Sequence, residues 1–262
     1  MADFPGTTLA CFGLVGTLIA DDGVVELAYS EAIATQGVVS GTSAYARCMA
    51  QVHRARGQGP GDVLAALFPD NPARAQAARL AFDRSLAGTV ARTVASPIPG
   101  AQEVLEQLAA SGCRTCVLTI LPRRDLTAML RAAGWRDLIT LALTDDDVPR
   151  GCPFPDLVLA AMLRAGVGDV REVAVVQGTA AGVECGRRAG AGIVAGVLTG
   201  PHPAARLRAA GATYVLDSVA ELPAVLAEGG ARPVAPGEPA AADPAGISLP
   251  QQRPAERRPL GL

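Results

Sequence analysis

Few side chains in this sequence are suited to moving a proton, and they fall into two groups. His53 stands beside Arg54 and Arg56, and because histidine titrates near neutral pH it is a candidate acid or base. A run of three aspartates at 145–147 follows an apolar segment. We expect this run at the rim of a site, where Asp145 could act as a base or the run could bind a cation. The alternative for both groups is a solvated turn.

Other residues offer hydrogen bonds, charge or thiols. Thr119 ends an apolar segment, and Arg123 follows it as either a helix cap or a contact for an anionic ligand. His202, which stands between two prolines, is predicted to be a turn residue. Cys113 and Cys116 form a C-x-x-C pair, but no second cysteine pair or nearby histidine completes a metal site. Both are therefore predicted to be structural.

The composition excludes several classes of protein. The 262 residues are 50% hydrophobic and carry a formal net charge of −2, so we expect neither a nucleic-acid nor a membrane surface. No apolar run reaches the roughly 18 residues of a membrane span, and the N-terminus lacks the pattern of a secretory signal, so we expect a cytoplasmic protein. All 23 basic residues are arginine, which excludes any mechanism that needs a lysine imine.

The elements that must position these residues alternate along the chain. Apolar segments predict strands at 9–12, 116–119, 139–143, 173–176, 192–197 and 213–216. Helical spacing predicts helices at 101–111, 125–133, 156–165, 182–189, 204–210 and 219–227. This alternation indicates an α/β fold with a mostly parallel sheet and helices on both faces. Ligands bind beyond the carboxyl ends of such strands, so we expect the site in the loops after the first four strands.

A helical stretch from about 25 to 95 interrupts this alternation after the first strand. The sequence therefore predicts a Rossmann-like α/β core at 8–20 and 98–230, with an inserted α-helical cap at 21–97. From 231 to 262 the composition turns to Pro, Ala, Gly and Arg without periodicity, which predicts a disordered tail.

Several motifs along the chain have a familiar order. They are Phe12-x-x-x-Gly16-Thr17, Pro97-Ile98-Pro99-Gly100-Ala101, Leu118-Thr119, Pro153-x-Pro155-Asp156 and a run from Val173 through Gly192. Together these motifs resemble the haloacid dehalogenase superfamily, and most closely its phosphonatase-like branch. The resemblance extends from about Leu9 to Leu226, and it implies a cleft between a Rossmann-like core and a helical cap.

The resemblance also implies a set of catalytic residues that this chain lacks. The superfamily uses an aspartate nucleophile, a basic residue, and acidic residues that hold magnesium, and its phosphonatases add a cap lysine. The matching positions are Gly13 for the nucleophile, Cys152 for the base, and Gly178 and Gly182 for the aspartates of a motif that reads Gln177-Gly178-Thr179-Ala180-Ala181-Gly182. Glycine offers no carboxylate to Mg²⁺. We therefore expect no conventional magnesium-dependent phosphohydrolase, no metal site and no cofactor.

Two classes of function remain open. The first is a repurposed, metal-independent enzyme that acts on a non-phosphorylated small molecule in the cap–core cleft by cyclisation, isomerisation, elimination or hydrolysis. Its candidate catalytic residues are His53 and Asp145. The second class is a non-catalytic pseudoenzyme that binds a small molecule or a protein partner. The missing residues disfavour a third possibility, residual phosphatase or phosphonatase activity.

The ligand of either class is expected to be a small molecule, and the chain could form a homodimer. The residues predicted to contact the ligand are Gly13, Thr17, Arg54, Arg56, Thr119, Arg123, Cys152 and Gly178. A deep pocket with a buried histidine or aspartate would favour the enzyme. An exposed apolar patch on the cap would favour the partner-binding protein.

Overall fold

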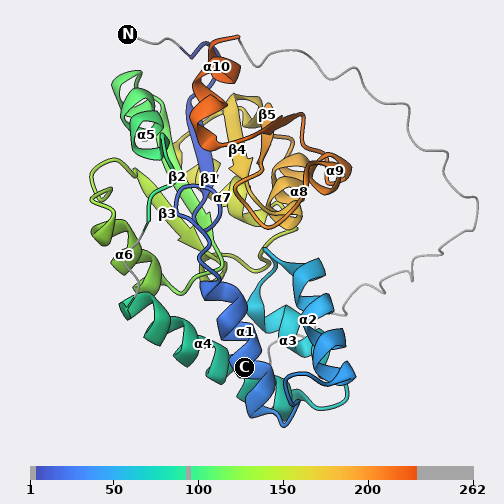
Figure 1. The fold of residues 1–262 in the computed structure, drawn as a ribbon. Coiled ribbons are helices and arrows are strands. Elements are labelled where there is room, and N and C mark those ends of the chain that lie inside the picture. Colours follow the sequence, from blue (N-terminus) through green and yellow to red (C-terminus); the bar gives the residue numbers. More distant parts are fainter. Residues whose placement is uncertain (1–3, 93–95, 229–262) are drawn as a thin grey trace, which may run out of the picture. The chain divides into compact units, whose positions relative to one another are not determined.

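Parallel strands form the centre of the fold, as the sequence predicts (Figure 1). They are β1 (Leu9–Gly13), β2 (Arg114–Thr119), β3 (Leu141–Thr144), β4 (Val173–Gln177), β5 (Ile193–Val197) and β6 (Tyr214–Leu216). Their order across the sheet is β3-β2-β1-β4-β5-β6, and every neighbouring pair is parallel. β1 and β4 therefore lie side by side at the centre of the sheet, with β2 on the other side of β1.

The computed structural model describes residues 4–92 and 96–228. The predicted tail at 231–262 lies outside these residues. The described residues belong to one compact unit, Met1–Ala231, which contains both the sheet and the inserted helices. The predicted boundaries between a core and a cap therefore remain predictions.

The strands are buried on both faces because their side chains are apolar on both. In β1, Ala10 and Phe12 belong to one apolar cluster, whereas Leu9 and Cys11 belong to another. Successive residues of a strand point to opposite faces, so the two clusters lie on opposite sides of the sheet. A sheet covered on both faces explains why the strands are apolar throughout rather than alternating.

The helices of the α/β part agree closely with those predicted. They are α5 (Ala101–Ala110), α6 (Arg123–Ala132), α7 (Asp156–Ala165), α8 (Ala180–Ala189), α9 (Ala204–Ala209) and α10 (Leu222–Ala227), with short 3-10 turns at Asp145–Asp147 (η1), Val170–Glu172 (η2) and Val219–Glu221 (η3). Helices α7 and α8 contribute to the cluster of Cys11, and α5 and α10 to the cluster of Phe12. The two groups therefore cover opposite faces of the sheet.

Four described helices stand between β1 and α5 and make up the insert. They are α1 (Val24–Thr35), α2 (Ser43–Ala55), α3 (Pro60–Leu67) and α4 (Pro72–Arg92). Tyr29 of α1 and Phe82 of α4 are buried against each other, with ring centroids 4.6 Å apart. The insert packs below the carboxyl ends of the strands in the view of Figure 1.

The cysteines are all free thiols, and five of the six are buried. Cys113 and Cys116 lie in different apolar clusters, which confirms their structural role. Burial raises the pKa of the Cys113 thiol to about 11, so this thiol stays protonated at neutral pH. Among the described residues, no helix has the length and apolar character needed to cross a membrane. A cytoplasmic location and a homodimeric assembly remain predictions.

Candidate functional site

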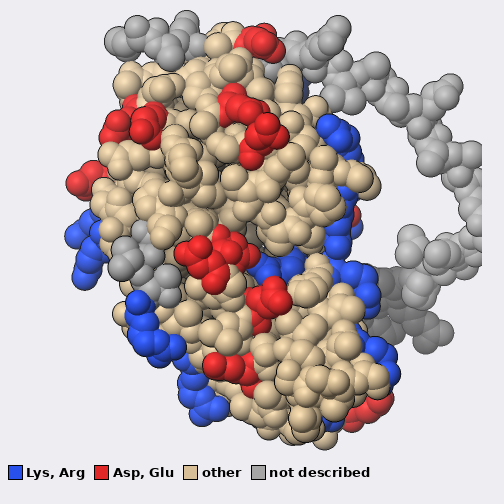
Figure 2. Space-filling model, in the orientation of Figure 1, with Lys and Arg blue, Asp and Glu red and all other residues tan. Residues whose placement is uncertain are grey.

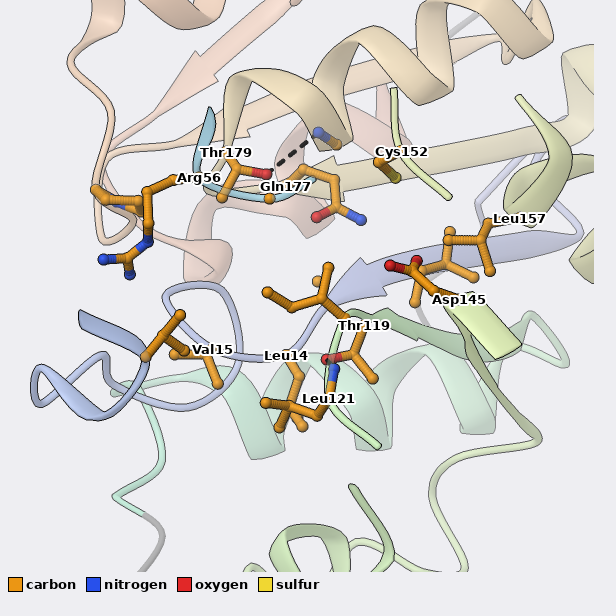
Figure 3. A pocket seen from close by; sticks show the side chains of 17 residues that line it. Leu14, Val15, Arg56, Thr119, Leu121, Asp145, Cys152, Leu157, Gln177 and Thr179 are labelled. Atoms are coloured by element: carbon orange, nitrogen blue, oxygen red, sulfur yellow. Dashed lines mark hydrogen bonds between the residues drawn. The ribbon is translucent and has the colours of Figure 1, made fainter. Parts of the chain in front are cut away.

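A pocket with about 600 Å³ of empty space, part of it open to solvent, lies at the carboxyl ends of the strands. The carboxyl ends of the first four strands each contribute, as the sequence predicts: Gly13 ends β1, Thr119 ends β2, Asp145 follows β3 and Gln177 ends β4. The insert contributes Val25, Arg56 and Gly57. Much of the remaining wall is apolar and includes Leu14, Val15, Leu118, Ile120, Leu121 and Leu157 (Figure 3).

The side chain of Gln177 fills the space beside Gly13 and Gly182. A methyl group at Gly13 would lie 2.5 Å from Gln177 Oε1 and 2.7 Å from Thr17 Oγ1. A methyl group at Gly182 would lie 2.6 Å from Gln177 Oε1 and 2.8 Å from Gln177 Cγ. Normal contacts are about 3.5–4.0 Å. An aspartate at either position would therefore collide with this glutamine.

Gly178 is fixed by backbone contacts. Its N–H donates to Thr17 Oγ1 at 3.0 Å, and a methyl group here would lie 2.6 Å from the carbonyl oxygen of Gly16 and 2.8 Å from Gly200 Cα. The loop leaves no room for a side chain at this position. The residues at the expected magnesium positions therefore do not fit that metal, because they offer no carboxylate and an amide fills the space between two of them. In the described part of the chain, no group of three or more His, Cys, Asp or Glu could hold a metal ion.

Asp145 presents an unpaired carboxyl to the pocket. Both carboxylate oxygens are buried, and neither has a hydrogen-bond partner. The Asp145 carboxyl is held between two glycines. A methyl group on Gly59 would lie 2.8 Å from Asp145 Oδ2, and a methyl group on Gly151 would lie 2.6 Å from Asp145 Oδ1. Burial is the main cause that raises the pKa of Asp145 to about 6, and the charge of Asp62 adds to it. Asp145 can therefore exchange a proton near neutral pH.

The positive charge in the pocket lining is already neutralised. The guanidinium of Arg56 is 7% exposed and pairs with Asp21, and it lies 3.9 Å from Glu26. The amides at the start of α8 are also engaged. Gly182 N–H donates to Thr179 Oγ1 at 3.2 Å, and Ala180 N–H donates to His202 Nδ1 at 2.8 Å. Neither group is free to balance a phosphate dianion.

The two predicted catalytic residues are not brought together. Asp145 lines the pocket, whereas His53 lies outside its lining. The His53 side chain is 52% exposed, and its Nε2 lies 3.3 Å from Glu26 Oε2. The other two aspartates of the run also point elsewhere. Asp146 is exposed, and Asp147 accepts hydrogen bonds from Thr144 and pairs with Arg123. Figure 2 shows acidic side chains gathered beside a hollow where the sheet meets the insert.

The predicted ligand contacts divide evenly. Four of them line the pocket: Gly13, Arg56, Thr119 and Cys152. The other four lie elsewhere: Thr17, Arg54, Arg123 and Gly178. Thr17 is buried as an acceptor for Gly178, and Arg54 and Arg123 are exposed. Arg123 serves the fold, because its guanidinium donates to the Ala142 carbonyl at 3.2 Å.

Sequence reasoning missed the roles of two residues. Gln177 is part of a motif, but the sequence did not predict that it lines the site. The available signal was that this large residue stands next to Gly178 and close to Gly182, the two glycines at the expected carboxylate positions of the motif. His202 lies in a bend, as predicted, but its side chain is only 4% exposed. Its Nε2 contacts the carbonyl oxygen of His53 at 3.2 Å, and its Nδ1 accepts from Ala180 N–H, so His202 links the start of α8 to the insert. No sequence pattern signals such a contact.

Comparison with known proteins identifies the family of this chain. A family model described as haloacid dehalogenase-like hydrolase matches residues 7–190. The chain belongs to the haloacid dehalogenase-like hydrolases. The match confirms the family resemblance seen in the sequence.

Curated relatives support the phosphonatase-like branch. The phosphonoacetaldehyde hydrolase of Bordetella pertussis is 32% identical over 155 residues, which cover 50% of this chain and 56% of that protein. The phosphonoacetaldehyde hydrolase of Vibrio cholerae serotype O1 is 31% identical over 159 residues, which cover 51% of this chain and 58% of that protein. The chain thus spans little more than half the length of these relatives.

Solved structures share the fold over nearly their full length. A hydrolase from Pseudomonas syringae is 26% identical with a TM-score of 0.71, and the match covers 85% of this chain and 99% of that one. A phosphonoacetaldehyde hydrolase-like protein from Oleispira antarctica is 23% identical with a TM-score of 0.73, and the match covers 87% of this chain and 97% of that one. The α/β fold with its parallel sheet is therefore that of haloacid dehalogenase-like hydrolases.

Proposed function

We propose that this chain is a metal-independent enzyme that acts on an uncharged, non-phosphorylated small molecule in the pocket, with Asp145 as its acid–base group. The observation that carries the proposal is the buried, unpaired Asp145 carboxyl in the same pocket as Gly13, where the Gln177 side chain occupies the space of the expected nucleophile. Reactions that need one well-placed proton transfer suit this arrangement, namely isomerisation, elimination, cyclisation or hydrolysis.

The charges around the pocket support an uncharged ligand. Arg56 is balanced by Asp21 and Glu26, so its charge is not available to an anion. The apolar wall favours a ligand with a large hydrophobic part. A phosphate ester would need a nucleophile and a source of positive charge, and the pocket lining offers neither.

A metabolite screen tests this proposal. The full chain, in buffer with EDTA, would be screened by thermal shift against uncharged metabolites and phosphorylated ones, and hits would be incubated and followed by mass spectrometry. We expect an uncharged hit to be converted without added metal. Asp145→Asn should still bind it but convert it about 10²–10⁴-fold more slowly.

Two controls make the result decisive. Asp146→Asn changes the exposed neighbour and should leave the rate unchanged. If Asp145 acts as a base, kcat/KM should rise with pH through about 6 and then level off, since the carboxylate is the active form. A hit that binds but is never converted would instead support the non-catalytic pseudoenzyme. An undiminished rate in Asp145→Asn would remove Asp145 from the chemistry.

A further inference from the structure

The amide of Gln177 is a polar group without a protein partner. Its residue is 6% exposed and lines the pocket. Within the described part of the chain, nothing is hydrogen-bonded to its side chain. The amide atoms of Gln177 are not among the fully buried polar atoms without a partner, so they remain accessible from the pocket. Gln177 is therefore available to a hydrogen-bonding ligand.

Gln177 and Asp145 direct their polar groups into one space. Figure 3 shows both side chains in the lining of the pocket, Gln177 at the end of β4 and Asp145 in the turn after β3. Gln177 offers an N–H₂ donor and a carbonyl acceptor. Asp145 accepts hydrogen bonds when ionised and donates one when protonated. Neither residue supplies the other with a hydrogen bond.

We infer that Gln177 determines the specificity of this pocket, and that it recognises the carboxamide or lactam group of an uncharged ligand. Such a group carries a carbonyl acceptor for the Gln177 N–H₂ and an N–H donor for Asp145 or for the Gln177 oxygen. The apolar residues Leu14, Leu121 and Leu157 would contact the rest of the ligand. This inference rests on the proposed function, because it names the ligand class of the same pocket.

The same geometry disfavours a metal–phosphate ligand. Gln177 Oε1 occupies the space beside Gly13 and Gly182, so a carboxylate at either position would require this side chain to move. The glutamine is also uncharged and cannot balance a cation. The two glycines and Gln177 are therefore complementary in size. In place of charged groups, Gln177 offers the pocket a neutral hydrogen-bonding amide.

The test uses small lactams as probes of the ¹⁵N-labelled full chain. Valerolactam has both donor and acceptor, N-methylvalerolactam has only the acceptor, and inorganic phosphate represents the anionic ligand. We expect valerolactam to shift the NMR signals of the Gln177 side-chain N–H₂ and of the Thr119 and Gly182 amides. Gln177→Leu, which keeps the volume, and N-methylation should each weaken binding by about 3- to 10-fold. Phosphate should neither bind nor compete.

A second variant protects the test from a folding defect. Gly182→Ala keeps Gln177 but places a methyl group 2.6 Å from its Oε1, so the amide must move. We expect this variant also to bind valerolactam more weakly. Unchanged affinity in Gln177→Leu, competition by phosphate, or no shift at the highest soluble lactam concentration would overturn the inference. Gln177-dependent lactam binding together with full activity in Asp145→Asn would overturn the proposed chemistry alone.

Discussion

The buried carboxyl of Asp145 gives the folded chain a measurable dependence on pH. Its pKa is about 6 in the folded state, against 3.8 for an exposed aspartate, so the folded state binds this proton more tightly than the unfolded state. The contribution of Asp145 to the free energy of unfolding should therefore fall as pH rises from about 4 to about 6, by on the order of 3 kcal/mol, and then stay level. Asp145→Asn cannot ionise and should lack this fall.

Urea unfolding between about pH 4 and pH 7 measures this difference. The difference in stability between Asp145→Asn and the wild type should shift in favour of the variant as the pH rises. Asp146→Asn is the matched control, because this neighbour is exposed. Parallel pH curves for Asp145→Asn and the wild type would show that the Asp145 carboxyl has an ordinary pKa.

His202 should contribute stability with the opposite dependence on pH. Burial lowers its pKa from the ordinary 6.5, and the charges of Arg206 and Arg56 act in the same direction. Neutral Nδ1 is the acceptor for Ala180 N–H, so protonation would break this bond. The stability that His202 provides should therefore be complete above about pH 6.5 and be lost as pH falls below it.

The change His202→Phe tests this role. It removes the acceptor for Ala180 N–H and the contact with the His53 carbonyl, and we expect a loss of about 1–3 kcal/mol at neutral pH. Chemical unfolding measures the loss. His53→Ala is the control, since this histidine is 52% exposed. Equal stability of the two variants would refute a structural role for His202.

At the residue scale, the sequence predicted polar groups better than it predicted their surroundings. Asp145 was predicted because it follows a core strand, and Arg56 because it stands close to His53 in a predicted loop of the insert; both line the pocket. Only the local backbone geometry decides which of the neighbouring candidates, Arg56 or His53, lines the pocket. Arg56 leaves helix α2 with φ −51° and ψ 130° and enters the pocket, whereas His53 stays on the helix and faces solvent.

At the scale of elements, the contact between the insert and the start of α8 is closely packed. Gly57 has φ +90°, and a methyl group on it would lie 2.7 Å from Thr179 Cβ. Gly57→Ala therefore meets both backbone strain and a collision. We expect it to lower the free energy of unfolding by about 2–4 kcal/mol in total.

Gly41→Ala separates these two costs. Gly41 has a similar φ of +84°, but a methyl group there would have nothing within 4 Å. It should therefore show only the backbone cost of about 1–2 kcal/mol. Hydrogen exchange at 53–60 should increase in Gly57→Ala and stay unchanged in Gly41→Ala. Equal effects of the two variants would mean that the insert does not press on Thr179.

Most elements could be predicted because their signals are local. The strand Val173–Gln177 is apolar up to its last residue, and helix Asp156–Ala165 is followed directly by a glycine. The packing of the insert on the sheet could not be predicted, since it depends on side chains far apart in the sequence. His202 and the carbonyl of His53 are an example, because neither residue type nor spacing indicates that contact.

At the scale of the whole molecule, the chain has the family fold, whereas a replaced charged site is a prediction from its motifs. The chain belongs to the haloacid dehalogenase-like hydrolases. The sequence predicted that Gly13, Gly178 and Gly182 stand at the carboxylate positions of the family. It could not show that Gln177 fills the space between two of them, because that depends on how the ends of β1, β4 and α8 converge. The side chain of Gln177 lies against both Gly13 and Gly182, which supports the proposal that the site was remodelled as a unit.

The central claim is that this remodelled pocket works without magnesium, and calorimetry tests it most directly. The full chain would be titrated with MgCl₂ in metal-free buffer. Because glycines replace the carboxylates and Gln177 fills the space between Gly13 and Gly182, only heats of dilution are predicted. Saturable binding of magnesium with micromolar affinity would contradict the account.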